Sequence, residues 1–294
     1  MTAKETLDVK AVVLLTGLCI LWGLNGVAIK ISNVGIDPIF CAGIRSVIAG
    51  LGLVIWMKTK GMLLFPGSIL DGVAVGILFG VEFAFLFSSL LFTTASSAWI
   101  LLYTTPFFHT LGAHFFLKGD RITVPKALGL LLSFVGIVIL LSKYLGITSF
   151  SQFTGDLFAL VAAVLWAVTT IYIRKRLVGK ITHHHTLFYQ TVFSIPILFA
   201  LSMLFGETPV RHVDVLVLSS VLFQGIIVAF ISYIFWFYLV YTYPISRVSA
   251  FTFLTPVFGG ISGILFLHEP ATLRLTLSLL FVSLGIYVVN LKRP

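Results

Sequence analysis

Charged residues are scarce in this chain. They make up 10% of its 294 residues, whereas hydrophobic residues make up 59%. Soluble domains carry about 25% charged residues. A chain with so little charge cannot cover a globule of this size with polar surface, and its mean hydropathy of +1.11 points the same way. The composition therefore excludes a water-soluble protein and indicates a membrane protein.

Cysteines and catalytic motifs are also scarce. The two cysteines, Cys19 and Cys41, lie inside apolar runs and belong to no metal or redox spacing, so we expect them to pack in the interior. The sequence contains no phosphate-binding glycine loop, no Ser/His/Asp pattern and no zinc spacing. We therefore expect neither an enzyme nor a protein that needs a metal or another cofactor.

Long apolar runs are what the sequence does contain. Runs of about 18 or more apolar residues cross a bilayer as helices, because lipid offers backbone groups no hydrogen-bond partner. We expect transmembrane helices over 11–31, 38–57, 70–92, 95–117, 125–142, 155–174, 186–205, 215–241, 247–267 and 273–291. The prediction is an all-α membrane protein with ten transmembrane helices and short connections. These connections leave no room for a soluble catalytic domain.

The distribution of Lys and Arg predicts the orientation. If the N-terminus lies in the cytoplasm, most of the 19 Lys and Arg residues fall in cytoplasmic connections. Such a bias is typical of membrane proteins. Both termini are therefore expected in the cytoplasm. The formal net charge of +9 then reflects membrane topology and does not indicate a nucleic-acid partner.

The sequence contains an internal repeat. The segment WGLNGVAIK (22–30) matches WAVTTIYIR (166–174), Thr105–Pro106 matches Thr255–Pro256, and Gly136 in SFVGIVILLSK matches Gly285 in VSLGIYVVNLK. The order of the matches is the same in both halves. We infer two copies of a five-helix unit, residues 1–147 and 148–294.

A unit of five helices has an odd number of crossings, so the second copy enters the membrane from the opposite side. Inverted repeats are typical of secondary transporters, in which two halves enclose a site at the membrane midplane. The alternative is a duplicated structural bundle without a transport pathway.

The chain resembles the drug/metabolite transporter superfamily, in particular its EamA-type members. The resemblance rests on W-G-x-N in the first run (Trp22, Gly23, Asn25) and on Arg45 in GIRSVIAG. The proline-centred pattern of the fourth and ninth runs, which ends in an acidic residue and Thr, adds to it. The resemblance covers the whole chain and implies a carrier of small metabolites in the cytoplasmic membrane, often an exporter of amino acids. It does not identify the substrate.

Two charged residues lie deep inside the apolar runs. Arg45 and Glu82 are each about 12 residues, or roughly 18 Å along a helix, from the expected cytoplasmic end. A charge at this depth is costly and is usually paired or functional. The two residues are candidates for a structural ion pair. Alternatively, Glu82 binds a proton or a substrate ammonium group, and Arg45 tunes the pKa of Glu82.

Pro106 and Pro256 are expected to kink their helices, because proline removes a backbone hydrogen bond and kinked helices build transporter sites. His109 follows Pro106 by one turn and is a second candidate for proton coupling, since histidine titrates near neutral pH. The alternative is a histidine that is hydrogen-bonded within the bundle.

Aromatic and polar residues near these positions are the candidate lining of a central cavity. Aromatic faces with polar neighbours can hold a cation or the side chain of a zwitterion, although Trp and Tyr also serve as interfacial anchors. The candidates are Trp22, Asn25, Glu82, Tyr103, His109, Trp166, Thr169, Gln224, Tyr233 and Trp236.

The sequence thus predicts a multi-pass carrier in the cytoplasmic membrane. It would move a small molecule, an amino acid or a related amine, by alternating access. We expect it to function as a monomer in the lipid bilayer, without a nucleic-acid partner. Export coupled to inward proton movement follows from the resemblance alone. An uncoupled facilitator, an exporter of organic cations or drugs, and a structural membrane protein or channel remain alternatives.

Overall fold

The computed structural model describes residues 6–93, 95–142, 149–267 and 273–291. Within these residues the chain is all-helical apart from connections and isolated bridges. Eight helices of the described part are long and apolar enough to cross a membrane. The two remaining apolar runs form shorter helices that are broken midway. The expected all-α membrane fold is therefore confirmed.

The elements follow the predicted runs closely. The first half contains α1 (Val9–Gly35), α2 (Pro38–Thr59), α3 (Ile69–Phe92), α4 (Ala95–Leu102), α5 (Thr105–Phe116) and α6 (Val124–Leu141). The second half contains α7 (Phe150–Arg176), α8 (His183–Leu204), α9 (Val215–Leu222), the π-helical segment η2 (Phe223–Ser232), α10 (Tyr233–Thr242), α11 (Ile245–Ala250), the 3₁₀ segment η3 (Phe251–Phe253), α12 (Leu254–Leu267) and α13 (Leu273–Asn290).

Short polar side chains cap several of these helices. The Asp8 carboxylate accepts a hydrogen bond from the Ala11 amide at 2.9 Å, and Asp214 accepts one from the Val217 amide at 2.8 Å. The first amides of a helix have no partner within the helix, so a cap at this point satisfies one of them. The caps place the starts of α1 and α9 where the sequence changes from polar to apolar.

Both broken helices are interrupted at the Thr-Pro dipeptides. α4 ends at Leu102, and α5 begins at Thr105, directly before Pro106. In the second half, the 3₁₀ segment η3 ends just before Thr255–Pro256. Proline cannot donate the amide hydrogen bond that a continuous helix requires. The two copies of the dipeptide therefore produce a break in each half.

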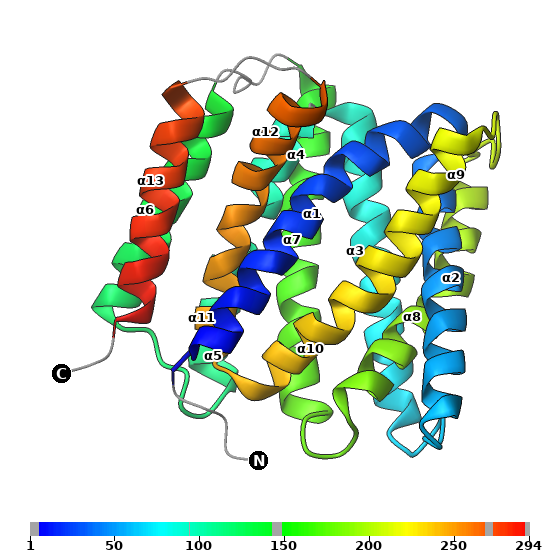
Figure 1. Ribbon diagram of the computed structural model, residues 1–294, viewed down its shortest axis with the longest axis horizontal. Helices are drawn as coiled ribbons and strands as arrows, with labels where there is room; N and C mark the ends of the chain where they lie inside the picture. The colour runs from blue at the N-terminus through cyan, green and yellow to red at the C-terminus, as the bar shows by residue number, and fades with distance from the viewer. Residues whose placement is uncertain (1–5, 94, 143–148, 268–272, 292–294) are drawn as a thin grey trace.

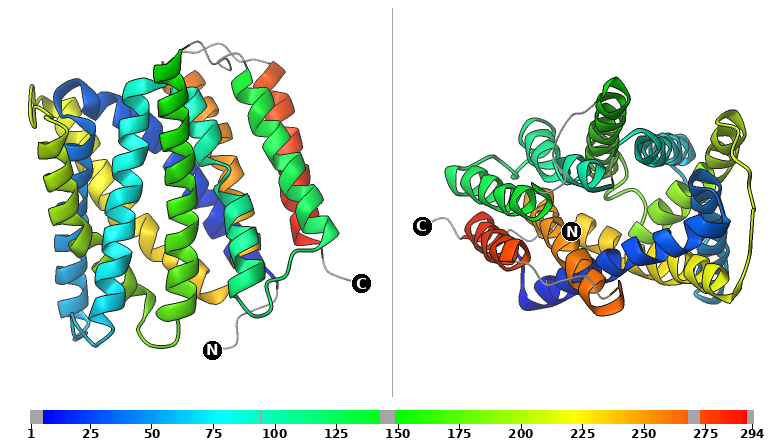
Figure 2. Two further views of the ribbon diagram at one scale, coloured as in Figure 1. Left: turned by 180° about the vertical axis from the view of Figure 1, so that it is seen from behind. Right: turned by 90° about the horizontal axis from the view of Figure 1, so that it is seen from above.

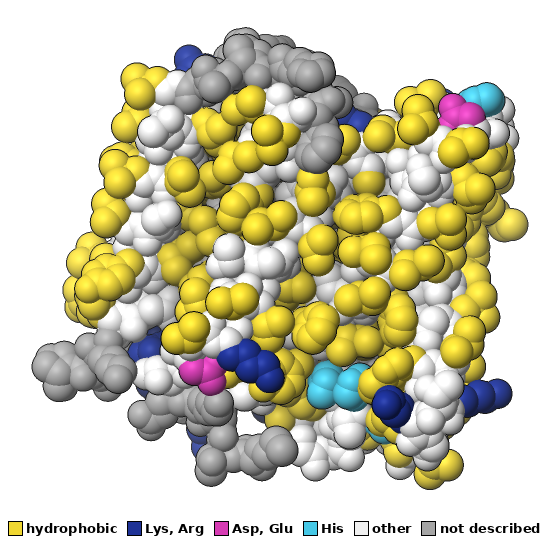
Figure 3. Space-filling model, in the orientation of Figure 1, with side chains coloured by type: hydrophobic (Ala, Val, Ile, Leu, Met, Phe, Trp, Pro, Cys, Tyr) yellow, Lys and Arg dark blue, Asp and Glu magenta, His cyan; other side chains and the backbone are white. Residues whose placement is uncertain are grey.

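The helices form a single bundle whose two described termini lie at one end (Figure 1). α1 begins and α13 ends at this end, which we call the terminal end; the opposite end is the distal end. The side face in Figure 3 is largely hydrophobic, and most of its Lys, Arg and His side chains lie at the terminal end. This pattern fits a bundle surrounded by lipid along its sides.

α6 and α13 form an antiparallel pair at one edge of the bundle (Figures 1 and 2). Small residues allow the backbones to approach closely. A Cβ atom on Gly129 would lie 2.5 Å from the carbonyl oxygen of Gly285, and one on Gly136 would lie 3.0 Å from that of Ser278. The pair is thus held by close backbone contact at two levels.

α2 and α8 form a second antiparallel pair. A Cβ atom on Gly43 would lie 2.8 Å from the Phe199 ring, and one on Gly50 would lie 3.6 Å from the Val192 side chain. α8 also packs against α3. It therefore lies between α2 and α3 and separates these two helices along most of their length. Elsewhere, α1 packs against α12, and α7 packs against α4 and α5.

The close contact between α6 and α13 predicts a specific sensitivity. In Gly285→Ala the new Cβ would lie 2.1 Å from Ser133 Oγ and 2.4 Å from the Gly129 carbonyl oxygen. We expect the free energy of unfolding in detergent to fall by about 1–3 kcal/mol because the helices must separate. Gly17→Ala is the control, since its Cβ would meet nothing within 4 Å. Equal losses in the two variants would contradict this packing.

Candidate substrate cavity

A cavity of about 660 Å³ lies inside the bundle, between helices of both halves. It extends from the middle of the bundle to the distal end. There its lining includes Leu141, the last residue of α6, and Leu275 near the start of α13. The exposed side chains of Lys30 and Arg274 also line it at this end. The cavity is therefore closest to solvent at the distal end.

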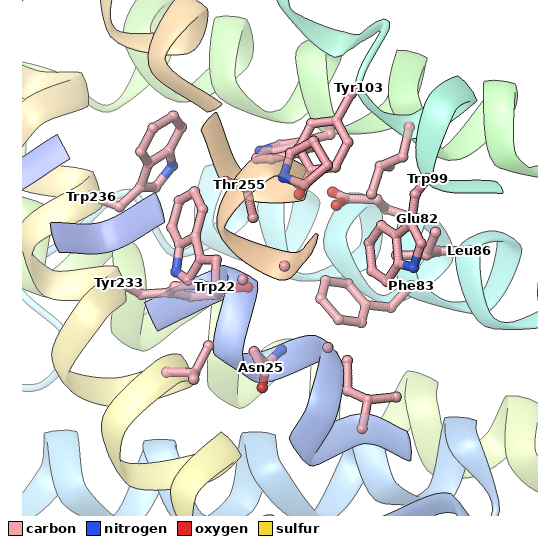
Figure 4. Close-up of a pocket in the computed structure, with 18 of the residues that line it drawn as sticks. Trp22, Asn25, Glu82, Phe83, Leu86, Trp99, Tyr103, Tyr233, Trp236 and Thr255 are labelled. Atoms are coloured by element: carbon pink, nitrogen blue, oxygen red, sulfur yellow. The ribbon is translucent and has the colours of Figure 1, made fainter. Parts of the chain in front are cut away.

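Eight of the ten predicted candidates line this cavity: Trp22, Asn25, Glu82, Tyr103, Trp166, Thr169, Tyr233 and Trp236. Arg45 and Pro256 line it as well, whereas Pro106, His109 and Gln224 do not. The lining residues come from α1, α3, α7, α10 and α12 among others, so helices that are far apart in the sequence meet around one space (Figure 4).

Three tryptophans form one wall of the cavity. The Trp22 ring lies 5.3 Å from the Trp236 ring, in an edge-to-face arrangement, and the Trp166 ring lies 6.3 Å from Trp236. The Trp22 Nε1 atom donates a hydrogen bond to Ser232 Oγ at 2.9 Å. Aromatic pairs at these separations are favourable, and a satisfied indole N–H fixes the ring. The wall connects α1 to α7 through Trp236 of α10. α1 and α7 carry the matching segments of the internal repeat.

Glu82 carries the acidic side chain of the cavity. Its side chain comes from α3, is 5% exposed, and extends into the space beside Tyr103 and Phe83 in Figure 4. Its Oε2 atom has no hydrogen-bond partner in the described structure. Among the described residues that line the cavity, Glu82 is the one acidic residue. A buried carboxylate without a partner is costly, so this residue needs a functional explanation.

Arg45 and Glu82 do not form the expected ion pair among the described residues. Arg45 instead donates a hydrogen bond from Nη2 to the Tyr233 hydroxyl at 3.1 Å, and its guanidinium lies 4.9 Å from the centre of the Phe83 ring. The expectation assumed that consecutive helices are neighbours. α8 packs between most of α2 and α3, and where the Arg45 guanidinium reaches α3 it meets the Phe83 ring and the Tyr233 hydroxyl of α10.

His109 lies behind the tryptophan wall. Its side chain is 1% exposed, and its ring lies 6.0 Å from the Trp166 ring in an edge-to-face arrangement. Neither ring nitrogen has a hydrogen-bond partner in the described structure. The Trp166 backbone lies beside the ring, so a histidine bonded within the bundle and a proton-coupling histidine both stay predictions.

Gln224 has a structural contact instead of a place in the cavity. It lies in η2 and donates hydrogen bonds from Nε2 to Ser32 Oγ at 2.9 Å and to the Ala28 carbonyl oxygen at 3.4 Å. These bonds tie the π-helical segment to α1. A buried amide in a membrane protein that satisfies its donors in this way stabilises helix packing.

Several lining residues are not among the candidates predicted from the sequence. Trp99 lies one helical turn before Tyr103, and the two rings stack 6.3 Å apart. The spacing of four residues on one helix could have identified it. Lys30 was recognised as the repeat partner of Arg174, but its place at the distal end of the cavity depends on the packing of α1 against α12.

The comparisons with known proteins agree with this geometry. The model of the EamA-like transporter family matches residues 9–142 and again residues 153–291. "Uncharacterized transporter YoaV" of Bacillus subtilis is 24% identical over 95% of this chain and 96% of its own. "Probable amino-acid metabolite efflux pump" of Salmonella typhimurium is 26% identical over 92% and 91%. A solved crystal structure that is 18% identical has a TM-score of 0.81 and covers 95% and 96% of the two chains, which shows the fold.

The contact between Arg45 and Tyr233 can be tested by mutation. Tyr233→Phe removes a hydrogen-bond partner from a buried guanidinium, and hydrogen bonds to charged groups contribute about 1.5–3 kcal/mol. We expect the free energy of unfolding in detergent to fall by this amount. Tyr287→Phe is the control, because Tyr287 is 66% exposed. An unchanged stability in Tyr233→Phe would mean that the guanidinium does not depend on this hydroxyl.

Proposed function

Because the chain belongs to the EamA-like transporter family, we propose that it is a secondary transporter that exports a small metabolite by alternating access. The cavity of about 660 Å³ between the two halves carries this proposal. Its size is within the range of small-molecule sites. The printed names of two relatives, both probable amino-acid metabolite efflux pumps, favour an amino acid or a related amine as substrate.

Reciprocal contacts support two inverted halves, 1–147 and 148–294. The internal repeat pairs Gly136 with Gly285 and, in the same register, Gly129 with Ser278. Gly129 contacts Gly285, and Gly136 contacts Ser278. A two-fold axis produces this kind of exchange. Because α6 and α13 are antiparallel, the axis would lie across the helices, in the plane of the membrane.

α2 and α8, the second helices of the two halves, also form an antiparallel pair. Gly43 contacts Phe199, and Gly50 contacts Val192. Two pairs of equivalent helices would therefore lie across the axis, with the cavity between helices of the two halves. This arrangement is the one that alternating access requires.

Contacts at the terminal end support a conformation that is closed there. Arg174, near the end of α7, donates from Nη1 to the carbonyl oxygens of Val240 at 2.5 Å and Tyr241 at 3.1 Å, near the end of α10. Asp120 accepts a hydrogen bond from the Ser246 amide at 3.0 Å and pairs with Lys126 at 2.6 Å. The hydrogen bond between Ser246 and Asp120 joins the two halves below the cavity, whereas Arg174 ties α7 to α10 within the second half.

The repeat relates this closed end to the distal end. Arg174 corresponds to Lys30, which is exposed and lines the distal part of the cavity. The end of α10, which Arg174 caps, corresponds to the end of α3. A cation is favourable at a helix C-terminus. In the opposite conformation, Arg174 would release α10 while Lys30 would cap the end of α3.

We further propose that the terminal end faces the cytoplasm of a cytoplasmic membrane. The exposed Lys58, Lys60, Arg176 and Lys180 lie in or next to connections at this end, as the positive-inside rule requires. The internal duplication provides both halves of the site within one chain, so a monomer would suffice.

Coupling to protons is part of this proposal. Glu82 and His109 are buried ionisable residues with unpartnered side-chain atoms, and such residues inside membrane proteins are often proton relays. Inward proton movement would then drive export. An uncoupled facilitator and an exporter of organic cations are alternatives, and a transport assay with and without a pH gradient distinguishes them from a proton-coupled exporter.

The experiment is uptake and counterflow by purified protein in liposomes, with and without a pH gradient, using the twenty amino acids and several amines. We expect saturable flux of at least one compound. Unlabelled compound on the opposite side of the membrane should accelerate this flux. A dependence on the pH gradient would support proton coupling. Flux that neither saturates nor shows exchange would indicate a channel and contradict the carrier.

The proposed alternation, in which either Arg174 caps α10 or Lys30 caps α3, gives a second prediction. Arg174→Gln removes charge-assisted hydrogen bonds that hold the terminal end closed, so the population open at the distal end should decrease, by about 10-fold or more. The measurement is the labelling rate of Thr169→Cys by a membrane-impermeant maleimide in intact cells. The native Cys19 and Cys41 are buried.

Lys30→Gln is the matched control for this measurement. In the described conformation Lys30 lines the cavity without closing it, so its loss should leave the labelling rate unchanged or raise it. Slower labelling of similar size in both variants would contradict the proposed exchange.

A further inference from the structure

Among the described residues no cationic side chain forms an ion pair with the buried carboxylate of Glu82, and Arg45 acts on it only from a longer distance. Arg45 is held by Tyr233 and Phe83, and the exposed Lys30 and Arg274 lie at the distal end of the cavity. A buried charge is retained only when it is paired or neutralised. Glu82 must therefore either bind a proton or pair with a cation that comes from outside the protein.

The walls next to Glu82 suit a cation. In Figure 4, Tyr103, Trp99 and Phe83 lie around the Glu82 side chain, and Trp22 faces them across the cavity. Aromatic faces attract ammonium and guanidinium groups, most strongly where water is excluded. The same rings also bury the apolar part of a ligand.

The unpaired polar atoms of the cavity are oxygens. Besides Glu82 Oε2, Asn25 Oδ1 and Thr255 Oγ1 are buried and have no hydrogen bond of standard geometry, although the Tyr103 hydroxyl and the Cys19 thiol lie beside Thr255. Oxygens of this kind need hydrogen-bond donors. A primary ammonium group has three N–H donors, whereas a quaternary ammonium group has none.

We propose that the substrate binds through a primary ammonium group that pairs with Glu82, with its apolar part against the aromatic walls. This inference rests on the proposed transport function and names the chemical class of its substrate. The ammonium group can belong to a zwitterionic amino acid or to an amine without a carboxylate. Lys30, Arg45 and Arg274 make the remaining charge of the lining positive, which favours the zwitterion.

The test is counterflow in liposomes with three matched sets of compounds: the twenty amino acids, the amines that correspond to them without the carboxylate, and the N-acetyl amino acids. We expect at least one amino acid or amine to exchange, and its N-acetylated form, which lacks the ammonium group, to fail. Exchange by the amine alone, by the amino acid alone or by both identifies the source of the ammonium group. An N-acetylated compound that exchanges as well as its parent overturns the inference.

Mutation of the carboxylate gives a second readout. Glu82→Gln keeps the size of the side chain and removes its charge, so the affinity for the exchanging compound should fall by about 10- to 100-fold. Glu207→Gln is the control, because Glu207 lies outside the cavity and binds the Ile39 and Phe40 amides and Ser202 Oγ. Unchanged affinity in folded Glu82→Gln protein overturns the inference.

The two proposals fail in different ways. If compounds without an ammonium group exchange, the protein is a carrier and only the assignment of Glu82 is wrong. In the other case, no compound in any of the three sets exchanges, although a cooperative unfolding transition shows that the protein is folded. The proposed substrate class then fails together with this inference.

Discussion

The need to satisfy every backbone hydrogen bond without water governs this structure. Lipid offers no partner, so the chain stays helical wherever it crosses the membrane. Where the helix is broken before Thr105, the hydroxyls of Thr104 and Thr105 donate to the carbonyl oxygens of Leu101 and Leu102 at 2.6 and 2.5 Å. In the second half the Thr252 hydroxyl donates to the Ser249 carbonyl oxygen at 2.7 Å. Hydroxyl side chains thus make irregular backbone possible beside the cavity.

The cavity follows from these breaks and from the pairing of the halves. Pro256 and Thr255 line it directly. Trp22 of α1 and Trp166 of α7 both contact Trp236 of α10. Small residues hold α6 against α13 at the edge of the bundle and also α1 against α12 beside the cavity, where a Cβ atom on Gly23 would lie 2.7 Å from the Gly259 nitrogen. Large aromatic residues of α1, α7 and α10 line the space next to this contact.

Much of this could be predicted from one sequence, because hydropathy and proline act locally. The apolar runs predicted the helices to within a few residues, and the Thr-Pro repeats predicted where two of them break. The contacts of Arg45 with Tyr233 and Phe83, in place of an ion pair with Glu82, could not be predicted, because they depend on which helices are neighbours. α8 separates α2 from α3, and hydropathy carries no information on lateral packing. The places of Gln224 and His109 outside the cavity have the same cause.

The position of the glycine contacts has a consequence for the energetics of transport. Contacts that lie on a two-fold axis are mapped onto themselves when the two halves exchange roles. In the proposed arrangement of two inverted halves, the contact of Gly129 with Gly285 would therefore persist unchanged through a complete cycle. The free energy that changes during a cycle would then be confined to off-axis contacts, such as those of Arg174 and Trp22. The close packing of α6 against α13 would act as a stationary frame that adds nothing to the barrier.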